Sequence, residues 1–165
     1  MVIYCSREFA KRYSCELSLP GEKLPQKGRL DDWSAHFIRI GRKPIVMMMH
    51  DATLWSVVIP ATGVTTLAKL LPLFLERVEG IWGGFGANFD PLNQSLIFLP
   101  RTDRSRTGSM NDAIRCSRHM AEIASYEKLP MDWERMEQQL NRTPYKALDY
   151  DSPEKKMAEL FGEAD

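Results

Sequence analysis

Three short apolar runs lie close together in the first 60 residues of the chain and are separated by polar turns. The runs are residues 36–40, 45–49 and 54–59, and residues 41–44 and 50–53 connect them. Connections this short join antiparallel neighbours, because a parallel return needs about a dozen residues or more. The pattern therefore predicts an antiparallel β-meander at the centre of the fold.

Two further strands and a short helix are expected around the meander. Residues 1–5 are typical of a strand, and Ser6 can cap a brief helix on which Phe9, Tyr13 and Leu17 share one face. Residues 20–28, with two prolines and two glycines, are expected to form a loop. Residues 94–99 are expected to return as a strand, which Pro100 closes.

The segment 65–79 has the apolar spacing of one helical face, which Leu67, Leu70, Leu71, Phe74 and Val78 form. Pro72 has no backbone N–H to donate, so we expect it to kink this helix or to start a second one. The following residues 80–88 contain Gly83, Gly84 and Gly86. We expect them to form a flexible connection.

The segment 101–112 is the most distinctive stretch, because it gathers arginines and small polar residues between two regular elements. Ser109, with Asp112 three residues later, resembles a capping box. We therefore expect a basic loop that leads into a helix starting at Ser109 and ending near Tyr126. Its spacing predicts a buried face made of Ala113, Cys116, Met120 and Ile123.

Two more helices are predicted near the end of the chain. Asp132 is expected to cap one with Trp133, Met136 and Leu140, and Ser152 and Pro153 to begin one with Met157, Leu160 and Phe161. The predicted fold class is α+β, an antiparallel β-meander with helices packed on it and a mainly helical C-terminal part. We expect a single domain over 1–165, in which 1–100 form mostly the meander with one or two helices and 101–165 form the basic loop and helices.

Composition and charge exclude several classes of protein and leave a globular domain as the expectation. Apolar residues make up 44% and charged residues 27%, and 22 Lys or Arg balance 22 Asp or Glu, so no global charge attracts nucleic acid or an anionic membrane. The longest apolar runs are far shorter than the roughly 20 residues that span a bilayer. Three widely spaced cysteines fit neither a disulfide framework nor a zinc site. We expect a cytoplasmic protein with reduced thiols and no membrane contact.

The arginine-rich segment is the main candidate site. Arg101, Arg104 and Arg106 precede the expected helix N-terminus, whose free N–H groups and positive dipole end favour an anion, and Arg115 extends the positive character. The alternative is that these arginines pair with the acidic C-terminal third, where residues 132–165 contain nine Asp or Glu against five Lys or Arg. Asn111 and Asp112 are explained either by capping of the helix or as a pair that polarises a ligand beside the arginines.

Other residues have a functional interpretation that ordinary structure also explains. His50 and Asp51 could form a general base with its orienting carboxylate, although a tight turn between strands uses the same residue types. His36 is expected to be a strand side chain, and three isolated histidines predict neither a metal site nor a cofactor. Trp33 and Trp55 are expected to pack in the core, with a base-stacking platform as the alternative.

The chain resembles a family of bacterial and phage- or plasmid-borne domains of unknown function. The resemblance rests on residues 30–35 (LDDWSA), on 53–54 with 57–60 (TL and VVIP), and on 104–112 (RSRTGSMND), and it covers most of the chain. It implies a small intracellular domain associated with mobile elements and carries no activity. Residues 140–154 are also similar to the end of integrase-type transposases, although a proline-bounded turn before a Ser-Pro-Glu helix start explains that stretch as well.

The sequence favours binding over catalysis, because no nucleophile, base and metal-binding residues gather around the polar segment. We expect a non-catalytic interaction module that contacts an anion, a nucleic acid or a protein partner, in an oligomeric state left open. The expected contact residues are Arg101, Arg104, Arg106, Ser109, Asn111, Asp112 and Arg115. One alternative is a small hydrolase or nuclease in which His50, Asp51 or His119 meets the arginines. Another is a member of a paired system, such as an antitoxin or inhibitor, with an apolar patch around Trp133, Met136 and Met157.

Overall fold

The computed structural model describes residues 1–18, 32–87, 90, 95–102 and 104–162, except for the side chains of residues 104–106. The predicted loop 20–28 lies outside the described residues. The elements in chain order are β1 (Val2–Cys5), α1 (Arg7–Tyr13), β2 (Asp32–Ile40), β3 (Lys43–His50), β4 (Ser56–Pro60), α2 (Leu67–Gly84), β5 (Ile97–Pro100), α3 (Arg104–Tyr126), α4 (Trp133–Arg142), the short 3₁₀ helix η2 (Lys146–Leu148) and α5 (Pro153–Phe161).

The five strands form one mixed sheet in the order β4-β3-β2-β1-β5. The predicted antiparallel meander is confirmed, since β3 pairs antiparallel with both β2 and β4. The sheet as a whole is not purely antiparallel, because β1 inserts between β2 and β5 and runs parallel to both. Long connections permit this: residues 6–31 separate β1 from β2, enough for a parallel crossover.

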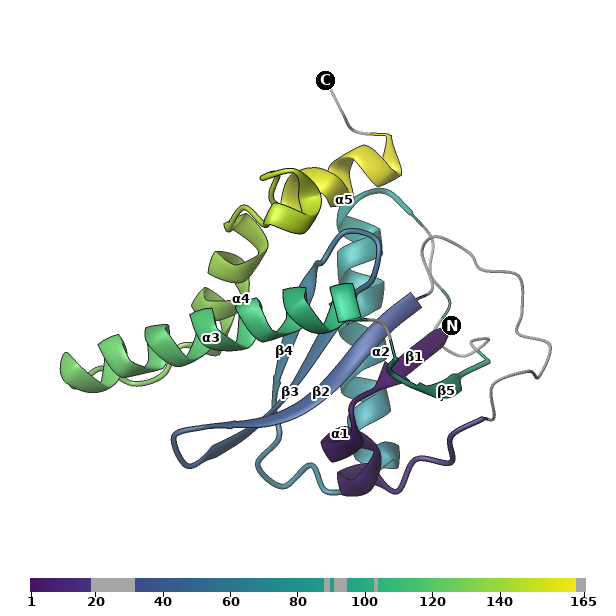
Figure 1. The fold of residues 1–165 in the computed structure, drawn as a ribbon, viewed down its shortest axis with the longest axis horizontal. Coiled ribbons are helices and arrows are strands. Elements are labelled where there is room, and N and C mark those ends of the chain that lie inside the picture. Colours follow the sequence, from purple (N-terminus) through teal and green to yellow (C-terminus); the bar gives the residue numbers. More distant parts are fainter. Residues whose placement is uncertain (19–31, 88–89, 91–94, 103, 163–165) are drawn as a thin grey trace.

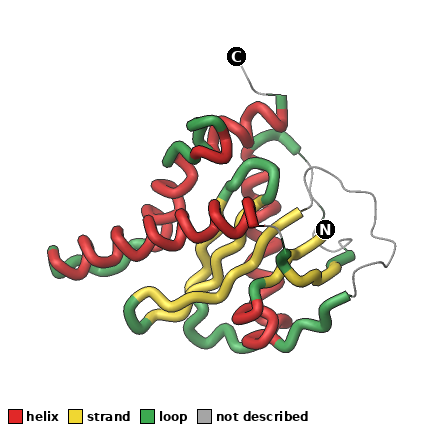
Figure 2. The backbone as a smooth tube through the Cα atoms, viewed as in Figure 1, coloured by secondary structure: helices red, strands yellow, loops and turns green. Residues whose placement is uncertain are grey.

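Helices cover both faces of the sheet, as Figures 1 and 2 show. Strand β3 displays the division, because alternate side chains of a strand point to opposite faces. Val46 and Met48 pack in one cluster with residues of α1, α2 and α5. Met47 and Met49 pack in the other with residues of α3 and α4. The run of three methionines thus serves two cores, and each side chain is essentially fully buried.

Helix α2 is longer than the sequence indicated. It continues through Pro72 and on to Gly84, so the flexible connection predicted from residue 80 is wrong as far as residue 84. The cause is tertiary packing: Phe74, Val78 and Trp82 follow each other at helical spacing and are buried against the sheet. Their burial outweighs the roughly 1 kcal/mol that each helical glycine costs relative to alanine.

Helix α3 begins at Arg104, so the capping box predicted at Ser109 and Asp112 is wrong. Ser109 is a buried residue inside the helix, and Arg101 and Thr102 lie between β5 and α3. The predicted end at Tyr126 is confirmed. Of the predicted buried face, Ala113 is fully buried but Ile123 is 45% exposed, because this part of α3 extends beyond the sheet (Figure 1).

Helix α4 closes the outer edge of the sheet. The Asn141 side chain accepts a hydrogen bond from the Ser56 N–H (2.7 Å) and donates one to the Ser56 carbonyl (2.9 Å). The Glu137 carboxylate accepts from the Val58 N–H (2.7 Å) and forms an ion pair with Arg77. Backbone groups of the edge strand β4 are thus bound by side chains of its own chain. This arrangement opposes pairing of that edge with another molecule.

Candidate functional site

Arg101 belongs to an internal polar cluster on the α3 side of the sheet. Its guanidinium Nη2 donates to His36 Nδ1 at 3.3 Å, and its backbone N–H donates to the Cys5 carbonyl at 3.0 Å. Ser34, two residues before His36 and therefore on the same face of β2, donates its hydroxyl to Asp51 Oδ1 at 2.7 Å. Asp51 also favours the charged form of Arg101 electrostatically, although burial lowers the Arg101 pKa.

The hydrogen bond from Arg101 fixes the charge state of His36. An arginine can only donate, so Nδ1 of His36 must accept and the ring is neutral. Burial and then the Arg101 cation lower the pKa of His36 to about 4. Arg101 is therefore engaged inside the protein, which separates it from the other predicted contact residues on α3.

The predicted contact residues on α3 divide between its two sides. Asn111, Asp112 and Arg115 are exposed, whereas Ser109 is buried. Arg115 forms an ion pair with Asp112 at 2.9 Å on its own helix. The backbone of Arg104 and Arg106 forms the first turn, and their side chains lie outside the described part.

Several carboxylates of the acidic C-terminal third form ion pairs with cations of the same region. Asp151 binds Lys155 and Lys156, both at 2.8 Å, and Glu154 lies 3.4 Å from Arg142. Among the described side chains, no ion pair joins this region to Arg101 or Arg115. The pairing proposed for these two arginines from the sequence is therefore not seen there.

His50 and Asp51 point to opposite faces of the sheet. The His50 ring is fully buried, binds the Thr53 hydroxyl at 2.8 Å and packs 5.2 Å from the ring of Trp33, in the core on the α2 side. Asp51 binds Ser34 on the α3 side. The histidine with an adjacent orienting carboxylate, considered from the sequence, is therefore not assembled. Trp33 is fully buried as well, so it forms no exposed platform with Trp55.

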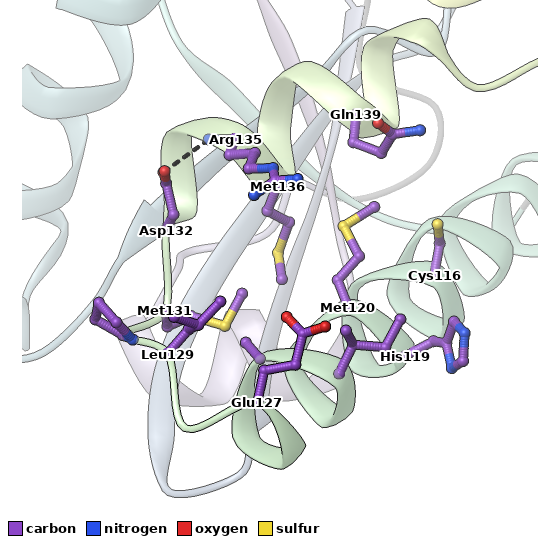
Figure 3. A pocket seen from close by; sticks show the side chains of 13 residues that line it. Cys116, His119, Met120, Glu127, Leu129, Met131, Asp132, Arg135, Met136 and Gln139 are labelled. Atoms are coloured by element: carbon purple, nitrogen blue, oxygen red, sulfur yellow. Dashed lines mark hydrogen bonds between the residues drawn. The ribbon is translucent and has the colours of Figure 1, made fainter.

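A cavity of about 410 Å³ lies between the second half of α3 and the start of α4. Met120, Met131 and Met136 converge on it from α3, the connection and α4 (Figure 3). Ile123 and Leu129 also line it while 45% and 55% exposed. We call these five side chains the methionine cleft. Its polar rim includes Glu127, Asp132, Arg135 and His119.

The sequence pattern predicts a buried core face where the structure has this cleft. Met120 and Ile123 continue the apolar spacing of α3, but they lie where the helix has passed the sheet, and α4 covers them only in part. Helical periodicity identifies an apolar face without showing how much of it another element covers. The aspartate on the rim, Asp132, has a structural task, since its carboxylate caps α4 by accepting from the Arg135 N–H at 2.9 Å.

The described residues contain neither a cluster of metal ligands nor a membrane-spanning helix. Among them, no three His, Cys, Asp or Glu side chains gather as metal ligands. No helix in the part of the chain that the structure describes is long and apolar enough to cross a membrane.

The fold and the cleft define a class: an α+β domain with a mixed five-stranded sheet, helices on both faces and a half-open apolar cleft at one end. The chain belongs to the family of the domain of unknown function DUF6933, whose model matches residues 2–156. No curated protein matches the chain.

Proposed function

We propose that this chain is a non-catalytic interaction module that binds apolar side chains of a partner protein in the methionine cleft. The observation that carries the proposal is an apolar cavity of about 410 Å³ whose mouth exposes Ile123 and Leu129. Exposed apolar surface around a hollow is typical of an interaction site.

The chemistry of the lining suits a peptide partner. Methionine is unbranched and polarisable, so the partly exposed Met120 and Met131 can adjust to side chains of different shape. The Tyr126 side chain, 90% exposed near the end of the same helix, adds a residue type that is enriched at interfaces. Of the patch expected from the sequence around Trp133, Met136 and Met157, both methionines are buried and Trp133 is half-buried. The apolar partner surface is therefore assigned to the cleft.

The test is binding of an uncharged apolar dye, Nile red, to the purified chain, followed by its fluorescence. Ile123→Asp places a carboxylate at the mouth, where bound dye would desolvate it, and should weaken binding by about tenfold, equivalent to about 1.4 kcal/mol. Leu73→Asp is the matched control, because Leu73 is 40% exposed on α2 and does not line the cleft. Equal binding by both variants would remove the cleft from the proposal.

A second candidate function follows from the exposed half of α3. Asn111, Arg115 and Arg118 are exposed there, and Arg104 and Arg106 stand in the first turn of the same helix. We propose a nucleic-acid contact by these residues as the alternative. Arg101 is not included because it hydrogen bonds to His36, and Ser109 is not included because it is buried. The Arg115–Asp112 ion pair opposes it, since it already neutralises one cation.

Fluorescence anisotropy of labelled single-stranded RNA at low and physiological salt distinguishes the two functions. If α3 contacts phosphates, the Arg104→Ala, Arg106→Ala double variant should bind more weakly and lower the salt slope by roughly one per lost contact. Lys69→Ala on α2 is the control, an exposed cation on another helix. No binding by the wild-type chain at either salt would exclude this alternative.

A further inference from the structure

The nine methionines of the chain differ in their access to solvent, and all of them lie in the part that the structure describes. Seven are buried with at most 6% of their surface exposed, at positions 1, 47, 48, 49, 110, 136 and 157. Met120 and Met131 alone are partly exposed. Both line the methionine cleft, so the accessible thioethers of this chain are gathered at one place on its surface.

The fold explains this distribution. Met120 stands in the second half of α3, where the helix extends beyond the sheet, and Met131 lies in the connection between α3 and α4. Figure 3 shows both side chains in the lining of the cleft. Met136 reaches the same cleft from α4 but is only 1% exposed. An oxidant that arrives from solvent therefore meets Met120 and Met131 first.

We propose that Met120 and Met131 form a methionine oxidation site, at which a hydroperoxide converts the thioethers to sulfoxides and thereby weakens binding of apolar groups in the cleft. The thioether sulfur attacks one peroxide oxygen, the O–O bond breaks and an S–O bond forms. The other oxygen takes up the proton and leaves as an alcohol or as water. Each sulfoxide consumes one hydroperoxide, and the sulfur gives two electrons to the oxidant.

Oxidation changes the chemistry of the cleft lining. A sulfoxide is polar and accepts hydrogen bonds from water, whereas the thioether is apolar. An apolar group that enters the cleft would strip water from the sulfoxide oxygen without replacing its hydrogen bonds. This effect on binding rests on the proposed function, but the oxidation site itself does not. The change is reversible, because methionine sulfoxide reductases return the sulfoxide to the thioether.

The first experiment maps the oxidised positions in the folded full chain after treatment with increasing hydrogen peroxide. Trypsin places the three methionines of the cleft in separate peptides, which are 119–128 for Met120, 129–135 for Met131 and 136–142 for Met136. We expect the first two peptides to gain one oxygen each before the third, and fragment ions should assign the oxygen in 129–135 to Met131 rather than Trp133. Equal gain in all three peptides would overturn the proposal.

The second experiment titrates Nile red before and after this treatment. Oxidation should weaken binding by about tenfold, because the dye would desolvate the sulfoxides. The two reductases, one for each sulfoxide epimer, should restore binding in the presence of dithiothreitol. Dithiothreitol alone should not, which separates this effect from reversible oxidation of the Cys116 thiol in the same cleft. Restoration by dithiothreitol alone would overturn the assignment to methionine.

A double variant, Met120→Leu with Met131→Leu, tests which side chains carry the response. Leucine has a similar volume and has no sulfur to oxidise. Compared with its own untreated form, this variant should show no change of Nile red binding after peroxide. A response equal to that of the wild type would contradict the proposal, and circular dichroism verifies that the treated chains remain folded.

The outcomes separate this proposal from the proposed function. If sulfoxides form at Met120 and Met131 while Nile red binding is unchanged, in a chain whose binding depends on Ile123, control of the cleft by oxidation is wrong and the cleft remains. If Ile123→Asp has no effect on binding, the proposed function fails and control of binding fails with it. The peptide map then still decides whether the two methionines are the oxidation site.

Discussion

At the scale of single residues, His36 and Arg101 place a neutral histidine beside a cation on a partly buried face of the sheet. Protonation of His36 must overcome burial, the charge of Arg101 and that of Arg118, and Glu8 alone favours it among the groups that act on this ring. The folded-state pKa of about 4 lies below the unfolded value of about 6.5. Between these values the unfolded chain binds more protons than the folded chain.

The free energy of unfolding should therefore fall as the pH falls from 7 to 5, because protonation of His36 favours the unfolded chain. The full shift corresponds to nearly 2 kcal/mol at pH 5, and we expect about 1 kcal/mol because His36 is partly exposed to solvent. Between pH 7 and pH 5 the free energy of unfolding of His36→Gln should fall by about 1 kcal/mol less than that of the wild type. Urea unfolding at both pH values measures this difference. His119→Gln, at an exposed histidine on α3, is the control. Identical slopes for wild type and His36→Gln would contradict the assigned pKa.

The sequence predicts three helix N-caps from residue type and position alone. Ser6, Asp132 and Ser152 each accept a hydrogen bond from the N–H three residues later, as expected. Ser109 carries the same local signal, but it is buried inside α3, which begins five residues upstream at Arg104. A capping residue type alone therefore does not determine where a helix begins.

At the scale of elements, α4 and β4 depend on each other through side-chain to backbone hydrogen bonds. Asn141→Ala leaves the N–H and carbonyl of Ser56 without these partners in a buried place, which should cost about 1–3 kcal/mol of unfolding free energy. Asn111→Ala, at an exposed asparagine on α3, should change it by less than about 0.5 kcal/mol. Denaturant unfolding of both variants checks this, and equal losses would contradict the role of α4 as an edge cover.

At the scale of the whole molecule, the meander followed from turn lengths, but the position of β1 did not. Short connections determine which strands pair, whereas the long connections around β1 leave its neighbours undetermined by local pattern. The methionine cleft was likewise not determined by local sequence pattern. Met120 and Ile123 have the spacing of a core face, and the arrangement of α3 beyond the sheet leaves Met120 partly exposed and Ile123 45% exposed.

Photo-crosslinking from position 123 tests the proposed partner binding most directly. The chain with benzoylphenylalanine in place of Ile123 is irradiated in native extract of its source cells, beside a chain with the same group in place of Leu73. The account predicts a discrete protein adduct from position 123 that disappears when Met120→Glu is added, because that change introduces a charge into the methionine cleft. The same adduct from both positions, or none from position 123, would contradict it.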